Sequence, residues 1–207
     1  MKVYCDNDIL LKLAAYDLAE LALAALGIPA GEMRVLSTAR FTFHGKDAVK
    51  GRARFGAEVY DRLHRLLARL SPITDAPDPK WEATMASVPG LDVGEALIFA
   101  SAAPDTEALV LIGDKRALAA LAGDPRCSEL AANLAGRILC WEQLLATLLR
   151  VAPFATVRDR IAARPEGDTA TRIVFGAHGD TSEEAVREGL HSYVADLRKH
   201  TGRLLRE

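Results

Sequence analysis

The sequence predicts an α/β fold with three layers, α/β/α, in which helices cover both faces of a central parallel sheet. Apolar segments of strand length alternate with segments that repeat apolar residues at helical spacing, a pattern typical of such folds. Residues 108–112 are all apolar, as expected for a strand that is covered on both faces. The 207 residues are 50% hydrophobic and 26% charged, which is an ordinary globular composition.

Each element follows from its residues. Short apolar runs predict strands at residues 3–5, 33–36, 108–112 and 137–140. Apolar residues at helical spacing predict helices at residues 9–26, 46–70, 94–103, 115–121, 141–149 and 182–199. Gly27 and Pro29 end the first helix, and Ser71-Pro72 ends the second before a proline-rich loop that reaches Pro79.

The pattern changes near residue 150. Prolines and glycines interrupt the chain from Val151 until the last helix, which a capping box introduces, with Thr181 as N-cap and Glu184 as its partner. We therefore expect a main domain at residues 1–150 and a helical C-terminal extension, residues 151–207, packed on its core.

Composition narrows the class of protein. The net charge of −2 and the pI of about 6.2 give no overall basic field for nucleic acid. Three cysteines without CxxC spacing suggest buried thiols in a reducing compartment, not a disulfide framework or a zinc site. Charged residues interrupt the apolar stretch 9–28, which excludes a membrane span. Met1-Lys2 leads directly into a predicted strand, so we expect no signal peptide. We expect a soluble, cytoplasmic protein without a membrane partner.

Acidic residues follow or precede two predicted strands. Asp6 and Asp8 come directly after the first strand, Asp114 follows strand 108–112, and Glu95 lies on the helix before that strand. Ligands of open parallel sheets bind beyond the carboxyl ends of the strands. Carboxylates crowded there are tolerable when they share a hard cation such as Mg²⁺ or Mn²⁺. These four acids are the predicted metal ligands.

Helix capping is the alternative explanation for the same acids. Aspartate is a favoured N-cap, and a carboxylate suits the positive end of a helix. A single aspartate would cap the first helix, whereas this chain has both Asp6 and Asp8 there and further acids near other helix starts. The pair favours a site over a cap.

Three segments of the chain resemble a known family. VYCDNDILLKLA, LDVGEALIFASA and LVLIGDKRALAAL are similar to the successive acidic motifs of the PIN-domain superfamily, which includes toxin-type metal-dependent ribonucleases. The resemblance covers residues 1–150. It implies a metal-dependent nuclease that hydrolyses RNA with bound Mg²⁺ or Mn²⁺, catalytic roles for Asp6, Glu95 and Asp114, and a position near the metal for Asp8.

One departure keeps a binding function open. Many active members of that superfamily carry a further glutamate on an early helix, and here only Glu32 and Glu58 lie in the corresponding range, without a matching motif. A PIN-like binding module without catalysis is therefore an alternative, with the extension as a partner surface or as the interface of a homo-oligomer. A toxin-type role would imply an antitoxin, of which the sequence gives no direct sign.

A haloacid-dehalogenase-type phosphatase is a third interpretation. Asp6 would be its nucleophile and Asp8 its general acid, with Gly113-Asp114 as the metal motif. Two positions fit this pattern poorly, because Leu10 and Leu118 stand where that family has other residue types.

A basic segment is the candidate contact for nucleic acid. Residues 40–69 contain eight Lys or Arg against three acids. Such clusters bind phosphate backbones by counterion release. The predicted contacts are Arg40, Lys46, Lys50, Arg52, Arg54 and, beside Asp114, Lys115. A solvated amphipathic helix is the alternative for this segment.

Overall fold

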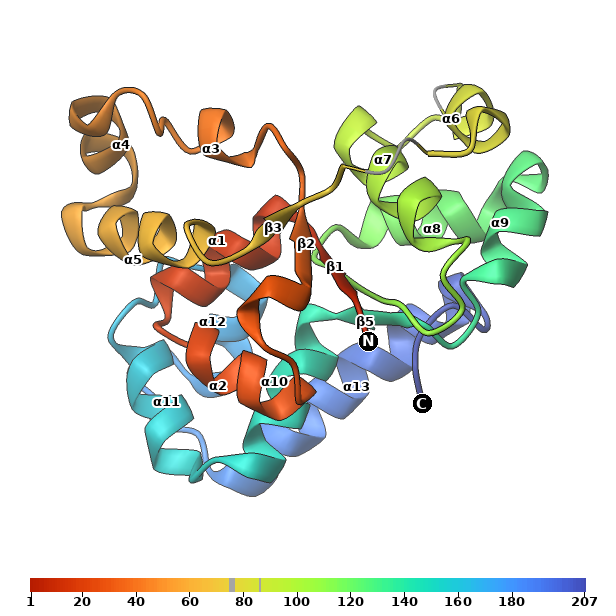
Figure 1. The fold of residues 1–207 in the computed structure, drawn as a ribbon. Helices are drawn as coiled ribbons and strands as arrows, with labels where there is room; N and C mark the ends of the chain where they lie inside the picture. The colour runs from red at the N-terminus through yellow and green to blue at the C-terminus, as the bar shows by residue number, and fades with distance from the viewer. Residues whose placement is uncertain (75–76, 86) are drawn as a thin grey trace.

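A computed structural model describes residues 1–74, 77–85 and 87–207 (Figure 1). Within these residues, all strands form one parallel sheet in the order β3-β2-β1-β4-β5. The strands are β1 (Val3–Cys5), β2 (Met33–Val35), β3 (Ser71–Pro72), β4 (Leu109–Ile112) and β5 (Ile138–Cys140). The three-layer α/β/α fold with a central parallel sheet is confirmed.

The central strands end at the same level. Cys5 of β1 is the register partner of Leu111 of β4, and the amide of Asp6 donates to the Leu111 carbonyl at 3.0 Å. The residues that follow β1 and β4 therefore emerge side by side at the carboxyl edge of the sheet.

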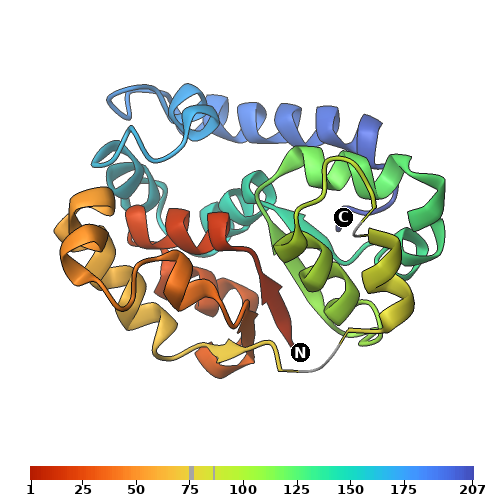
Figure 2. The same cartoon turned by 90° about the horizontal axis from the view of Figure 1, so that it is seen from above.

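Alternate side chains of the strands enter two separate apolar cores. Val3 and Cys5 belong to one core and Tyr4 belongs to the other, as the period of two along a strand requires. The helices before residue 151 whose buried residues enter the first core include α1 (Asn7–Ala15), α2 (Ala19–Leu26), α5 (Ala57–Leu67) and α10 (Trp141–Val151). Those that enter the second core include α6 (Pro79–Met85), α7 (Val93–Ala102), α8 (Lys115–Gly123) and α9 (Ser128–Asn133). Figure 2 shows the two helical layers on opposite sides of the sheet.

Residues 151–207 contact several helices of the preceding part of the chain and, at their end, β5. This segment contains α11 (Phe154–Ala162), α12 (Thr169–Phe175) and α13 (Glu183–Thr201). The long α13 contacts both α10 and α8, so that its Leu190 lies in the first core and its Leu197 in the second (Figure 2). Beyond α13, Leu205 forms a parallel bridge with Ile138 of β5. Because α13 joins both cores, the extension forms part of the folded core.

Two predicted long helices are each divided in the structure. Helix 9–26 breaks between α1 and α2, where Asp17 has a φ of 54°. Helix 46–70 breaks at Gly56, with a φ of 82°, into α4 (Ala48–Phe55) and α5. The two halves pack closely against each other. A Cβ on Gly51 of α4 would lie only 2.1 Å from the Tyr60 ring of α5. The apolar pattern continues across each break, so periodicity alone predicted one helix.

Other local predictions were also wrong. Ser71–Pro72 forms β3 at the edge of the sheet, where a proline is tolerated because its missing N–H faces away from the ladder. Ser182, not Thr181, caps α13, and its hydroxyl accepts from the Ala185 amide at 3.3 Å. Short helices unforeseen in the sequence include α11, α12 and α3 (Ala39–Thr42). Residues 75 and 76 of the predicted proline-rich loop lie outside the described residues.

A helix that spans a membrane must be both long and apolar. None of the helices in the described ranges meets both conditions.

Candidate functional site

An open pocket of about 660 Å³ lies at the carboxyl ends of β1 and β4. In Figure 1 this edge of the sheet faces upward, towards α3 and α7. All four acids predicted as metal ligands line the pocket, together with one more, so that its carboxylates are Asp6, Asp8, Asp92, Glu95 and Asp114. Segments that are far apart in sequence thus bring five carboxylates to one place.

Asp6 is at the N-cap position of α1, yet capping does not account for its side chain. Its backbone is extended, with φ −71° and ψ 153°, but the carboxylate makes no capping hydrogen bond. Burial and, next, the charge of Asp8 raise the pKa of Asp6 to about 6, against a smaller lowering by the nearby Asn7 amide. Asp6 is thus a partly buried acid whose charged form the fold disfavours.

Asp8 is held by a buried lysine. The Lys12 ammonium lies 2.8 Å from Asp8, one helical turn along α1, and 2.9 Å from Asp168, which caps α12 in the extension. The Lys12 side chain is only 10% exposed. One cation therefore joins the pocket to the C-terminal extension.

Gly113 makes room for the Asp8 carboxylate. A Cβ at this position would lie 2.0 Å from Asp8 Oδ2, a distance that no real Cβ contact permits. We expect Gly113→Ala to displace Asp8 and to lower the free energy of unfolding by about 1–3 kcal/mol, measured by urea denaturation.

A matched control for that substitution lies on the next helix. A Cβ on Gly123, at the end of α8, would meet nothing within 4 Å. Gly123→Ala should be neutral or slightly stabilising, since alanine is the better helix former. Equal effects of the two substitutions would show that the Asp8 carboxylate does not restrict the side chain at position 113.

Glu95 also lines the pocket, and its side chain is buried. It forms a capping box with Asp92 at the start of α7, in which each side chain accepts from the other's amide at 2.8 and 2.9 Å. Burial raises the pKa of Glu95 to about 7; the hydrogen bond from the Asp92 amide opposes this, and the neighbouring carboxylates add to it. Capping explains where Glu95 lies but leaves one of its carboxylate oxygens for other partners.

Asp114 is a genuine helix cap. Its carboxylate accepts from the amides of Arg116 and Ala117 at the start of α8, and it pairs with the Arg116 guanidinium at 3.0 Å. Burial tends to raise the pKa of Asp114, but the Arg116 hydrogen bonds outweigh it and lower the pKa overall. The Arg116 side chain is 87% exposed, so the ion pair is readily exchanged for another cation.

The donor atoms suit a hard divalent cation, although they do not surround one as they stand. Within the described ranges, no three His, Cys, Asp or Glu side chains are grouped so that they could hold a metal ion. The lining groups are carboxylates, and Asn7 adds a buried Oδ1 with no hydrogen-bond partner among the described residues. Oxygen donors of this kind fit Mg²⁺ or Mn²⁺, provided that the carboxylates draw closer together.

The two glutamates in the range where many active PIN-domain proteins carry a further acid lie outside the pocket. Neither Glu32 nor Glu58 lines the pocket, and Glu58 pairs with Arg164 of the extension at 2.8 Å. Asp92 supplies an additional acid instead. Glu142, at the start of α10, is buried and pairs with Lys115 at 2.6 Å.

Two residues of the site escaped the sequence prediction. Asp92 is not among the four predicted metal ligands, although the D-x-x-E spacing of Asp92 and Glu95 indicates a capping box that places the two together. Lys12 stands four residues after Asp8, the spacing of a helical ion pair, which was its only signal.

The predicted nucleic-acid contacts differ in their surroundings. Five of them lie exposed on the α3–α5 side, and Thr42 of α3 borders the acidic pocket. Arg52 pairs with Asp61, Lys50 pairs with Asp47, and Lys115 is engaged with Glu142. The others, which form no ion pair with a described carboxylate, are Arg40, Lys46 and Arg54.

Comparison with known proteins supplies no relative. No protein-family model, no curated protein and no solved structure matches this chain.

Proposed function

We propose that the protein is a metal-dependent nuclease of the PIN-like type, which hydrolyses phosphodiesters of RNA. The observation that carries the proposal is the crowding of five carboxylates from three parts of the chain around one pocket at the sheet edge. Crowding and burial raise the pKa of Asp6 to about 6 and that of Glu95 to about 7. A fold that holds acids at such a cost is suited to a cation that neutralises them.

The chain's residues suggest a division of roles. Asp6 and Glu95 would hold Mg²⁺ or Mn²⁺ together with Asp114, and Asp8 stands beside them. Such an ion, when bound, lowers the pKa of water and stabilises charge on a phosphoryl group. In the protein without a cation the pKa of Glu95 is about 7, so cation binding near neutral pH would displace a proton from this carboxylate.

The basic segment supports a polyanionic substrate. Arg40, Lys46 and Arg54 are exposed on the side of the pocket that Thr42 borders. A backbone that tracks these cations would reach the carboxylates at the sheet edge. Their affinity for RNA would not depend on sequence, and it should weaken as salt rises.

A binding module without catalysis is the second candidate, and one observation favours it. Asp8 and Asp114 already have cationic partners in Lys12 and Arg116. If these pairs persist, too few free carboxylates remain for a metal ion. Mn²⁺ binding decides between the two candidates.

The test is a calorimetric Mn²⁺ titration, combined with cleavage of a fluorogenic single-stranded RNA. We expect saturable Mn²⁺ binding, RNA cleavage that EDTA abolishes, and an affinity for Mn²⁺ about tenfold lower in Asp114→Asn. Glu107→Gln, an exposed acid before β4, is the control and should match the wild type. No heat at millimolar Mn²⁺ would exclude the nuclease and leave the binding module.

The compartment also belongs to this proposal. All three cysteines are free and buried. We infer a cytoplasmic location on that ground, because reduced thiols persist there.

A further inference from the structure

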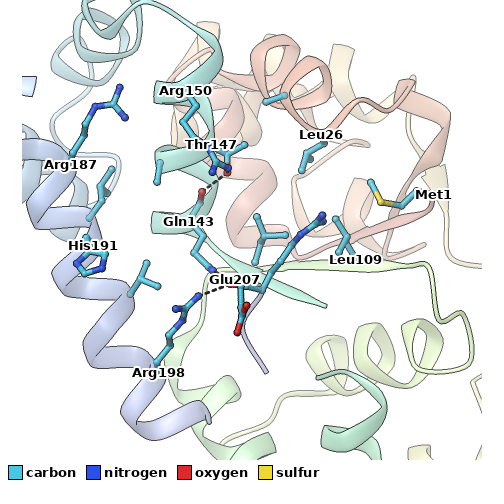
Figure 3. A pocket seen from close by; sticks show the side chains of 16 residues that line it. Met1, Leu26, Leu109, Gln143, Thr147, Arg150, Arg187, His191, Arg198 and Glu207 are labelled. Carbon is cyan, nitrogen blue, oxygen red and sulfur yellow. Dashed lines mark hydrogen bonds between the residues drawn. The ribbon is translucent and has the colours of Figure 1, made fainter. Parts of the chain in front are cut away.

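A second pocket, of about 680 Å³, opens at the other end of the molecule. It lies between α2, α10 and α13, and its floor includes Leu109, the first residue of β4, whereas the acidic pocket begins beyond the last residue of that strand. Figure 3 shows Arg150, Arg187 and Arg198 on one side of it and Leu26, Leu109 and Met1 on the other. The two pockets are therefore separate.

The pocket concentrates positive charge. Four arginines line it, Arg150, Arg187, Arg198 and Arg206, against a single carboxylate residue, Glu207. This excess is local, because the whole chain carries a net charge of −2.

Most of these arginines have no carboxylate partner. Arg187 pairs with Glu183 at 2.6 Å and donates to the Leu149 carbonyl, so it is satisfied. Arg150 donates to the Thr147 hydroxyl at 3.1 Å, and Arg198 donates to the Arg206 carbonyl at 2.8 Å. Among the described residues, no acid pairs with the guanidinium groups of Arg150, Arg198 or Arg206.

The floor of the pocket is aliphatic. Leu109 and Leu139 of the sheet and Leu190 of α13 reach it from the first core, and Leu26 and Ala146 are partly exposed beside them. Among the described residues, no Phe, Tyr or Trp side chain lines this space, and the one ring there is the imidazole of His191. An aliphatic floor below unpaired guanidinium groups matches a ligand with two unlike ends.

We propose that this pocket binds a small organic anion with a phosphate head and an aliphatic body. Guanidinium groups recognise phosphate oxygens with paired, charge-assisted hydrogen bonds. The volume lies within the usual range for small-molecule sites, in which an apolar lining and a few polar groups fix the ligand. This site is independent of the nuclease proposal.

Hexyl phosphate is the probe, compared by calorimetry with inorganic phosphate and with 1-hexanol on the full chain in EDTA. EDTA removes any cation that could bring phosphate to the acidic pocket. We expect saturable binding of one hexyl phosphate, about tenfold or more tighter than inorganic phosphate, since burying two methylenes already gives about that factor. Binding of hexyl phosphate no tighter than that of inorganic phosphate would overturn the proposal.

Variants locate the binding. Arg150→Gln combined with Arg206→Gln should weaken hexyl phosphate about tenfold or more. Arg172→Gln is the control, because Arg172 is exposed on α12, outside the pocket. Ala146→Trp, which fills part of the floor without changing charge, should also weaken hexyl phosphate. Unchanged affinity in the double variant, or in Ala146→Trp should the double variant fail to fold, would place the ligand elsewhere and refute the site.

Discussion

Asp6→Asn is expected to make the protein more stable at pH 8 while abolishing its response to Mn²⁺. The folded state raises the pKa of Asp6 from 3.8 to about 6, so between these values the folded chain binds more protons than the unfolded chain. Stability therefore falls as pH rises through this window, and the full penalty is present above it. Asparagine carries no charge and removes the penalty, a gain of at most about 3 kcal/mol at pH 8.

The same substitution removes a proposed metal ligand. Wild-type protein should gain about 3 kcal/mol of stability at a Mn²⁺ concentration a hundred times its Kd, whereas Asp6→Asn should gain almost nothing. RNA cleavage should fall by at least about a hundredfold. Denaturation curves at pH 4 and pH 8, with and without Mn²⁺, separate these effects, because the gain from asparagine should be small at pH 4, close to the unfolded pKa, and full at pH 8.

Two outcomes would contradict this account of Asp6. Lower stability of Asp6→Asn at pH 8 would mean that the carboxylate stabilises α1 as an ordinary cap. Equal stabilisation of wild type and variant by Mn²⁺ would place the cation elsewhere. Glu107→Gln, whose side chain is exposed before β4, should change neither property.

Four of the five pocket acids were predictable, because their position depends on local pattern and on one topological rule. Asp6 follows β1 directly and Asp114 follows β4 after a single glycine, and parallel strands end at a shared edge. Asp8 lies in the first turn of α1, just after β1, and Glu95 lies near the start of α7, the helix that precedes β4. Their convergence in one pocket required only that the strands be parallel neighbours, and β1 and β4 are.

What the sequence did not predict depends on contacts between distant segments. Nothing near Asp168 indicates that it meets Lys12, because the two residues are separated by more than 150 positions. The fold of α4 against α5 depends on Gly51 and Gly56, which leave space and permit a positive φ, whereas apolar spacing is the same in one helix or two. Periodicity reports which side of a segment is buried and does not report where the segment turns back.

Lys12→Met is expected to lower the free energy of unfolding by about 3 kcal/mol at pH 7, because it breaks a buried ion pair. Lys12 is 10% exposed, and its removal leaves Asp168, itself largely buried, without a cation. Lys50→Met is the matched control, because Lys50 also pairs with an aspartate but is 75% exposed. Its loss should cost less than about 0.5 kcal/mol.

A second variant and the pH dependence test whether the stranded carboxylate is the cause. Asp168→Asn added to Lys12→Met should recover at least half of the loss, since asparagine also caps α12 and carries no charge. In the wild type, burial tends to raise the pKa of Asp168, but the Lys12 hydrogen bond outweighs it and lowers the pKa, so this stabilisation is present above about pH 4 and is lost as pH falls further. Without Lys12, less opposes the effect of burial, so the pKa of Asp168 is higher in the variant. The stability difference between wild type and Lys12→Met should therefore shrink from pH 7 towards pH 4, as Asp168 of the variant becomes protonated. A deficit that stays constant with pH, or that Asp168→Asn fails to relieve, would mean that Lys12 acts by packing alone and that the extension is not joined to the pocket through its charge.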